Sequence, residues 1–199
     1  KDIKEHYSNR KVFLLTSEPY SIFMSECPYI DGVIIDKRLP RWNLIFLYKL
    51  KKTLSNYNFS KIIDLQNSKR TKFYRNFIIK KVEWSSSLDT LEPGQSKKDF
   101  DNHPVLDRME LQLKKNNIPT KSVKNIDLSW ANEDLSIITK QYTNRDYILV
   151  FPFCSKKHLN KKWPFFKELI SRIRREYRNN YSVLIAPGPD EIKEANELN

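Results

Sequence analysis

Glycine is scarce in this 199-residue chain, which contains only three. Glycine-rich loops such as GxGxxG and GxxxxGK[ST] arrange backbone N–H groups around phosphates, and neither motif occurs here, nor does GxSxG. This scarcity excludes most loops that hold a phosphate by backbone groups alone. A phosphorylated ligand would need side chains, or the N–H groups of a helix start, to bind it.

Cysteine and histidine are also few. Cys27 and Cys154 lie far apart and form no CxxC motif, and His6, His103 and His158 are scattered along the chain. The spacing excludes the usual structural zinc patterns and shows no catalytic triad. Two distant cysteines fit a reducing compartment better than a disulfide framework.

Long apolar runs are absent too. The longest spans residues 44–48, far too short to cross a bilayer, and the chain has neither a signal-peptide pattern at its start nor an internal repeat. We therefore expect a cytoplasmic protein. Contact with a membrane surface stays compatible with this expectation.

Positive charge is abundant. Lysine and arginine number 36 against 24 acidic residues, which gives a formal net charge of +12. Such an excess favours polyanionic partners: nucleic acid, phosphorylated ligands or an anionic membrane. It also suits a lysine-rich surface that contacts only solvent. Because 39% of the residues are hydrophobic and 13% aromatic, the chain can bury a sizeable core.

Short apolar runs alternate with amphipathic stretches along the chain. Runs that predict strands occupy residues 11–15, 31–36, 61–65, 81–84, 147–151 and 182–186. Stretches that predict helices occupy residues 42–54, the segment after Gln66, residues 104–116, residues 163–177 and the segment after Pro189. Strands that are apolar throughout and alternate with helices indicate a parallel sheet covered on both faces. The fold class is therefore predicted to be α/β.

Details of three segments follow from the same patterns. The first helix is expected to bury one stripe, made of Trp42, Ile45, Phe46, Leu50 and Leu54. Residues 85–102 read as a polar loop, and residues 119–145 as a connecting segment.

The alternation restarts at residue 147, which predicts two domains: residues 1–140 and residues 141–199. The second has only two strands, and a two-stranded sheet is a poor independent domain. The start of the chain reads as the end of a helix whose preceding strand is missing. We therefore expect an internal fragment of a longer protein.

Ligands of open α/β sheets bind beyond the carboxyl ends of the strands. The loop after the strand at 61–65 offers Asp64, Gln66, Lys69 and Arg70 at such an end. Either cation could hold an acidic acceptor. Alternatively, Asp64 only caps the next helix and the cations contact only water.

A second unusual loop lies between residues 151 and 163. Ser155, Lys161 and free N–H groups at the next helix start would together suit a diphosphate. Pro164 is expected in the first turn of that helix, with Trp163 as an apolar anchor. After the last strand, Asp190 or Glu191 could accept hydrogen bonds from ribose hydroxyls, or merely favour a helix start.

Four segments resemble one family of enzymes. The segment Phe59–Gln66 (FSKIIDLQ) resembles the "YDlvIDLQG" motif of glycosyltransferase family 9, the ADP-heptose:lipopolysaccharide heptosyltransferases. Residues 152–155 followed by 161–164 resemble "PGAS…KRWP", residues 188–191 resemble "GGPDE", and His103 with Arg108 resembles an "H…R" helix. The segments occur in the family's order. Asn67 and Phe153 depart from it, since the family usually has glycine there.

The resemblance implies a GT-B fold of two Rossmann-like α/β domains, the second incomplete in this chain. The N-terminal domain would bind the acceptor and the C-terminal domain the nucleotide sugar. The implied donor-binding residues are Ser155, Lys161, Asp190 and Glu191, and the implied acceptor-binding residues are Gln66, Lys69 and Arg70.

The implied reaction is inverting transfer of a heptose or similar sugar from an ADP-sugar to a lipid A–core acceptor, at the cytoplasmic face of the inner membrane. ADP-sugar is a substrate, and neither a cofactor nor a metal is expected. No catalytic residue is assigned, because the family's aspartate base would precede Lys1, and this chain alone is expected to be inactive. No nucleic acid partner follows from the resemblance. The alternative is a non-catalytic basic α/β domain that binds nucleic acid or another polyanion.

Overall fold

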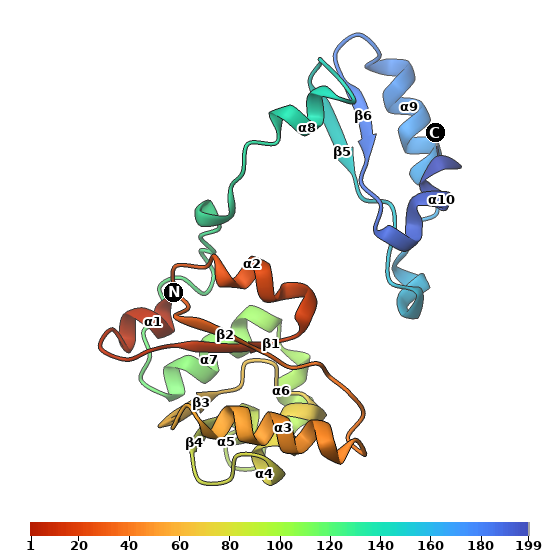
Figure 1. Ribbon diagram of the computed structural model, residues 1–199. Helices are drawn as coiled ribbons and strands as arrows, with labels where there is room; N and C mark the ends of the chain where they lie inside the picture. Colours follow the sequence, from red (N-terminus) through yellow and green to blue (C-terminus); the bar gives the residue numbers. More distant parts are fainter. Residues whose placement is uncertain (199) are drawn as a thin grey trace. The chain divides into compact units, whose positions relative to one another are not determined.

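A computed structural model describes residues 1–198 of the chain (Figure 1). The chain forms two compact units, one spanning Lys1–Asn132 and one that begins at Glu133. The sequence pattern places the boundary after residue 140, whereas the structure divides the chain after Asn132. The difference arises because the helix α8 (Ser136–Lys140) belongs to the second unit.

Unit 1 contains two small parallel sheets. β1 (Phe13–Thr16) pairs with β2 (Gly32–Ile35), and β3 (Lys61–Ile63) pairs with β4 (Glu83–Ser85). The register places Leu14 opposite Val33 and Ile62 opposite Trp84. The mixed α/β fold is as predicted, but within residues 1–198 the strands form two-stranded pieces, not one continuous sheet.

The helices of unit 1 connect and cover these strands. They are α1 (Asp2–His6), η1 (Glu18–Tyr20), α2 (Ser21–Ser25), α3 (Leu44–Ser55), α4 (Lys69–Phe77), α5 (Ser87–Thr90), α6 (Lys97–Asn102), α7 (Val105–Lys115) and η2 (Ser129–Ala131). α5 and α6 occupy the stretch predicted to be a loop, residues 85–102. Ser96 and Asp99 cap α6 reciprocally, which is a recognisable helix start that the charged composition obscures.

The core of unit 1 joins α3 and α4 to β2. Its buried members are Ile34, Phe46, Leu47, Leu50, Leu54, Tyr74 and Ile78. The predicted stripe on α3 is wrong for two residues, because Trp42 and Ile45 are exposed. Trp42 precedes the N-cap Asn43 and so does not follow helical periodicity, while Ile45 lies on the side of the helix opposite Leu47 and Leu54.

Unit 2 is a single parallel pair with helices. Its elements are α8, β5 (Tyr147–Val150), η3 (Lys156–Lys161), α9 (Phe166–Glu176), β6 (Ser182–Ile185), η4 (Pro189–Glu191) and α10 (Ile192–Asn196). α9 lies alongside β6 and buries Ile170 (Figure 1). Tyr147 and Leu149 of β5 are exposed. The expectation that both sheet faces are covered is therefore wrong for this unit.

Candidate functional site

The carboxyl end of β3 opens into a tight turn. Asp64, the first residue after β3, is buried and accepts hydrogen bonds from the N–H groups of Gln66 (3.1 Å) and Asn67 (2.9 Å). Asp64 therefore holds the turn, while Ser68 caps α4 by accepting the N–H of Thr71 at 3.2 Å. The helix-capping role considered for Asp64 belongs to Ser68.

Asn67 occupies the left-handed backbone region, with φ 51°. Its side-chain oxygen accepts the N–H of Ser87 at 2.5 Å, and its amide donates to Gln112 Oε1 at 2.9 Å. Asparagine tolerates this conformation better than most residues, which explains how it stands where the resembling motif has glycine. The departure from glycine adds two hydrogen bonds that a glycine could not make.

Gln112 ties the two strand ends together beneath this turn. Its side chain is fully buried, and its Nε2 donates to the carbonyls of Asp64 (3.1 Å) and Ser85 (3.0 Å). Since Gln112 belongs to α7, the helix fixes the carboxyl ends of β3 and β4 relative to each other. Sequence patterns gave no signal for this residue, because a lone glutamine on a helix usually faces water.

A cavity of about 350 Å³ lies beside the start of α4. Lys69 and Lys72 line it, together with Ser87 and Lys97. Lys97 pairs with Asp101 at 2.6 Å, whereas Lys69 and Lys72 are exposed and have no polar partner among the described side chains. Two available ammonium groups at a cavity rim can bind a phosphate or a carboxylate.

Arg75 forms part of the same cavity wall but is fully engaged. Its guanidinium donates to both carboxylate oxygens of Asp89, at 2.6 and 2.8 Å. Burial opposes ionisation of Asp89, yet hydrogen bonds from Arg75 and Ser86 prevail and lower its pKa below 3.8. The bidentate pair attaches α4 to α5, and Lys69 and Lys72 stay available to a ligand.

Arg70 lies on another face of α4, away from this cavity. Its Nη1 donates to the Tyr74 hydroxyl at 2.8 Å, and its Nη2 donates to the carbonyls of Arg38 and Leu39, both at 3.1 Å. Tyr74 in turn donates to Asp36 at 2.8 Å. Burial, and then the neighbouring Asp36, raise the pKa of Tyr74 to about 12 despite the opposing effect of Arg70.

The three predicted acceptor-binding residues are therefore not gathered in one place. Lys69 lines the cavity, Arg70 holds the loop after β2, and Gln66 is exposed and outside the cavity lining. Lys72 and Ser87 are cavity residues that sequence reasoning missed. Lys72 follows Lys69 by one helical turn, so helix spacing was a signal for it, whereas Ser87 is placed there by strand pairing.

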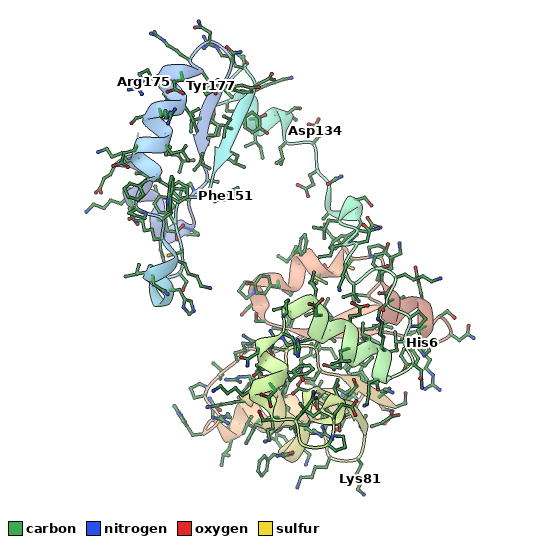
Figure 2. All side chains as sticks on the ribbon, turned by 180° about the vertical axis from the view of Figure 1, so that it is seen from behind. His6, Lys81, Asp134, Phe151, Arg175 and Tyr177 are labelled. Atoms are coloured by element: carbon green, nitrogen blue, oxygen red, sulfur yellow. The ribbon has the colours of Figure 1, made fainter. Side chains whose placement is uncertain are left out.

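The predicted donor side lies at the carboxyl end of the β5–β6 pair. In Figure 2 the label Phe151 marks this end, directly after β5. The labels Arg175 and Tyr177 mark the opposite end of unit 2, where α9 ends. Ser155 and Asp190 both follow these parallel strands, so they belong to the same edge of the sheet.

Lys161 and Lys162 differ sharply in their surroundings. Lys162 is ion-paired with Glu194, and its ammonium lies 5.6 Å from the centre of the Phe153 ring. Lys161 ends η3, is exposed, and has no polar partner among the side chains that the structure describes. Of the two lysines, Lys161 is the one available to an anionic ligand.

The helix that follows begins later than predicted. Pro164 lies in a turn two residues before Phe166, the first residue of α9, so it is not part of the first helical turn. The N-cap residue Phe165 makes no side-chain cap to α9, and none of the described side chains accepts from the N–H groups of its first turn. The Trp163 ring packs edge-on against Phe166 at 5.2 Å but is itself exposed, so it anchors the helix only partly.

Asp190 and Glu191 also have different surroundings. Glu191 turns back and accepts the N–H of Gly188 at 2.8 Å, which closes the loop after β6. Asp190 is exposed and makes no hydrogen bond or ion pair with the described part of the chain. A ligand hydroxyl would find Asp190 available without breaking a contact.

Comparison with known proteins identifies the family. The sequence profile of glycosyltransferase family 9 (heptosyltransferase) matches residues 47–199. The chain belongs to glycosyltransferase family 9. A search of curated proteins found no match.

A family 9 member also has a similar fold. The crystal structure of the glycosyl transferase family 9 from Veillonella parvula DSM 2008 matches this chain with a TM-score of 0.66 and 15% sequence identity. The match covers 99% of this chain and 59% of the solved one, so the chain spans little more than half of that protein. At this identity the likeness concerns the fold alone.

Proposed function

We propose that this family 9 chain is part of an inverting, metal-independent glycosyltransferase of the GT-B type. It would transfer a heptose or similar sugar from an ADP-sugar to a lipid A–core acceptor at the cytoplasmic face of the inner membrane. Unit 2 would bind the donor and unit 1 the acceptor. The observation that carries the proposal is the contrast between the available Lys161 and its ion-paired neighbour Lys162.

The chemistry requires stabilisation of a leaving diphosphate. The acceptor hydroxyl gives up its proton and attacks the anomeric carbon while the bond from that carbon to the diphosphate oxygen breaks. Negative charge then accumulates on the departing ADP. An ammonium and uncapped helix N–H groups can interact with this charge more strongly in the transition state than in bound substrate. Lys161 and the start of α9 are the groups of this chain suited to that task.

The remaining donor contacts follow from the same edge of the sheet. We assign Asp190 to the ribose hydroxyls, since its carboxylate has no competing partner among the described side chains, and give Glu191 the role of closing the loop. Ser155 lies on the same edge, where its hydroxyl can donate to a diphosphate oxygen.

On the acceptor side we assign Lys69, with Lys72, to an acidic group of the acceptor that enters the 350 Å³ cavity. Gln66 would contact the acceptor at the cavity entrance. Arg70 would also contact the acceptor, outside this cavity, while its guanidinium holds the loop after β2. No residue of the chain is assigned to the base that accepts the proton.

The test compares Lys161→Ala with Lys162→Ala in the enzyme that contains this chain. Lys161→Ala should lower kcat/KM for the ADP-sugar by roughly 30- to 1,000-fold, the effect of removing one preorganised charge-stabilising group. The free energy of unfolding should hardly change, because Lys161 is exposed and unpaired.

Lys162→Ala provides the matched control. It removes the ion pair with Glu194 and the contact with Phe153, so it should affect stability more than Lys161→Ala and kcat/KM much less. Equal losses of kcat/KM in the two variants would show that Lys161 has no special role at the diphosphate. A loss in Lys161→Ala that is explained by unfolding alone would lead to the same conclusion.

A further inference from the structure

Four large apolar side chains close together in the sequence are exposed at the start of α3. Trp42 is 80% exposed, Leu44 74%, Ile45 72% and Tyr48 68%. Leu44, Ile45 and Tyr48 share one face of the helix, and Trp42 precedes its N-cap. We call these four residues the α3 surface. Single exposed apolar residues are ordinary, but four together mark an interaction site.

The segment that carries the α3 surface contains charge of one sign only. Between Asp36 and Asp64 the sequence contains no acidic residue. The exposed cations nearest to the α3 surface in sequence are Lys37, Arg38, Arg41, Lys49, Lys51 and Lys52. None of the six is in an ion pair within the described chain, whereas Lys61, further along, pairs with Glu83. Much of the net charge of +12 is thus left unneutralised beside an apolar surface.

The loop that carries Trp42 is held in place before any partner arrives. Arg38 adopts φ 51°, a conformation that its N–H bond to Asp36 (2.8 Å) and the bonds from Arg70 to the carbonyls of Arg38 and Leu39 maintain. The side chain of Asn43 then caps α3 by accepting the N–H of Phe46 at 2.9 Å. A preformed surface loses little conformational entropy on binding.

We propose that the α3 surface docks on an anionic lipid bilayer. Leu44 and Ile45 would enter the acyl boundary, while the rings of Trp42 and Tyr48 would lie at headgroup level, where amphipathic aromatic side chains are favoured. The surrounding lysines and arginines would contact lipid phosphates. α3 has 12 residues, and within residues 1–198 no helix is both long and apolar enough to cross a bilayer, so α3 would lie in the interface.

Two other occupants fit the observations less well. A second copy of the chain would bring two unneutralised cationic rims together, and like charges repel. Nucleic acid would satisfy the cations but would leave Leu44 and Ile45 unused, because aliphatic side chains give bases no stacking platform. Of these three occupants, an anionic bilayer is the one that matches both the aliphatic centre and the surrounding cations.

The α3 surface and the acceptor cavity belong to the same unit, so docking here would hold the unit that binds the acceptor at the membrane. α4 links the two places, because Arg70 and Tyr74 hold the loop after β2 while Lys69 and Lys72 line the cavity. This inference deepens the membrane contact in the proposed function. Its test needs no sugar transfer, so either proposal can fail without the other.

The experiment measures partition of the purified chain onto vesicles by flotation. Vesicles contain phosphatidylethanolamine with 30% phosphatidylglycerol, and neutral phosphatidylcholine vesicles provide the comparison. Ile45→Ser should weaken binding to the anionic vesicles by about tenfold, since it removes an apolar side chain from the interface. Ile137→Ser is the matched control, because Ile137 is 75% exposed but lies on α8 of unit 2, and it should change binding less than twofold.

The contribution of the cations around the α3 surface is tested separately with the double variant Lys51→Gln/Lys52→Gln. Each cation near an anionic surface contributes about fivefold to binding, so the double variant should lose on the order of tenfold or more, and high salt should mimic the loss. Thermal unfolding by circular dichroism should be unchanged, because these side chains are exposed.

Three results would overturn the proposal. One is equal binding by Ile45→Ser and Ile137→Ser, and another is equal binding of the chain to neutral and anionic vesicles. The third is self-association in sedimentation experiments that Ile45→Ser abolishes while no vesicle binding is seen, which would assign the surface to a second copy of the chain.

Discussion

Tyr74→Phe removes one oxygen atom from the centre of unit 1 and should be costly. The hydroxyl donates to the buried carboxylate of Asp36 at 2.8 Å and accepts from Arg70 at 2.8 Å. The variant leaves Asp36 with its bond from the Arg38 N–H but without the tyrosine donor. Removing a hydrogen bond to a buried charged group costs about 1.5–3 kcal/mol of the free energy of unfolding.

The acid–base behaviour of Tyr74 gives a similar magnitude. A pKa raised from 10.0 to about 12 corresponds to roughly 2–3 kcal/mol of preference for the protonated hydroxyl in the folded state. Because the folded pKa is higher than the unfolded one, this stabilisation is complete below pH 10 and is lost as the pH rises through about 12. The free energies of the wild type and Tyr74→Phe should therefore converge between these values.

Urea unfolding followed by circular dichroism measures the effect at pH 8 and at higher pH. Tyr48→Phe is the control, since Tyr48 is exposed on α3 and its hydroxyl has no partner within residues 1–198, so its cost should stay below about 0.5 kcal/mol. If Tyr74→Phe costs no more than Tyr48→Phe, or if its cost is the same at pH 8 and pH 12, the hydroxyl does not hold the loop after β2 in the way described.

Two further predictions concern the cavity. Asn67→Ala should lower the free energy of unfolding by about 2–4 kcal/mol, because it loses the bonds to Ser87 and Gln112 and places alanine at φ 51°. Asn67→Gly removes the backbone strain and should therefore cost less. Equal urea midpoints for the two variants would contradict this expectation. Asp89→Asn should destabilise the chain at pH 7, where the wild-type carboxylate binds Arg75. Because the folded state lowers the pKa of Asp89 below its ordinary value of 3.8, the difference should shrink only as the pH falls below 3.8, which thermal unfolding at a series of decreasing pH values would detect.

The strands were predictable because each is a compact apolar run. The runs beginning at Lys11, Asp31, Lys61, Lys81, Tyr147 and Ser182 each overlap a strand of three or four residues, and the strands β1 and β4 extend one residue beyond the predicted run. The paired order of the strands was less accessible, since periodicity says which residues are buried and not which strands are neighbours. The short helices α5 and α6 were missed because four to six residues carry too little periodicity to stand out from a polar loop.

Burial on α3 shows where pattern reasoning fails. A stripe drawn from Trp42 assumes that the helix has already begun there, but the cap at Asn43 shifts the start by two residues. Once the helix begins at Leu44, Leu47, Leu50 and Leu54 form the buried stripe, and Ile45 is turned outward. An apolar residue can therefore fit a hydrophobic pattern and still serve a surface.

Individual site residues could be proposed from sequence, but the contacts that they make could not. The sequence does not distinguish Lys161 from Lys162, whereas in the structure Lys162 is ion-paired with Glu194, 32 residues away, and lies over the Phe153 ring. Arg70 was expected to contact the sugar acceptor. In the structure its Nη2 donates hydrogen bonds to two backbone carbonyls of a loop more than 30 residues earlier. Its direct contact with a sugar acceptor stays a prediction.

Gln112 has a consequence for how unit 1 can open. One amide group bridges the last carbonyls of two strands, and its oxygen receives the side chain that shapes the turn between β3 and α4. The floor of the cavity therefore cannot loosen one strand at a time: it opens only when α7 leaves, taking all of these bonds with it. We expect the protons of the backbone amides there to be replaced by solvent deuterium together and slowly, as is typical of one cooperative unit.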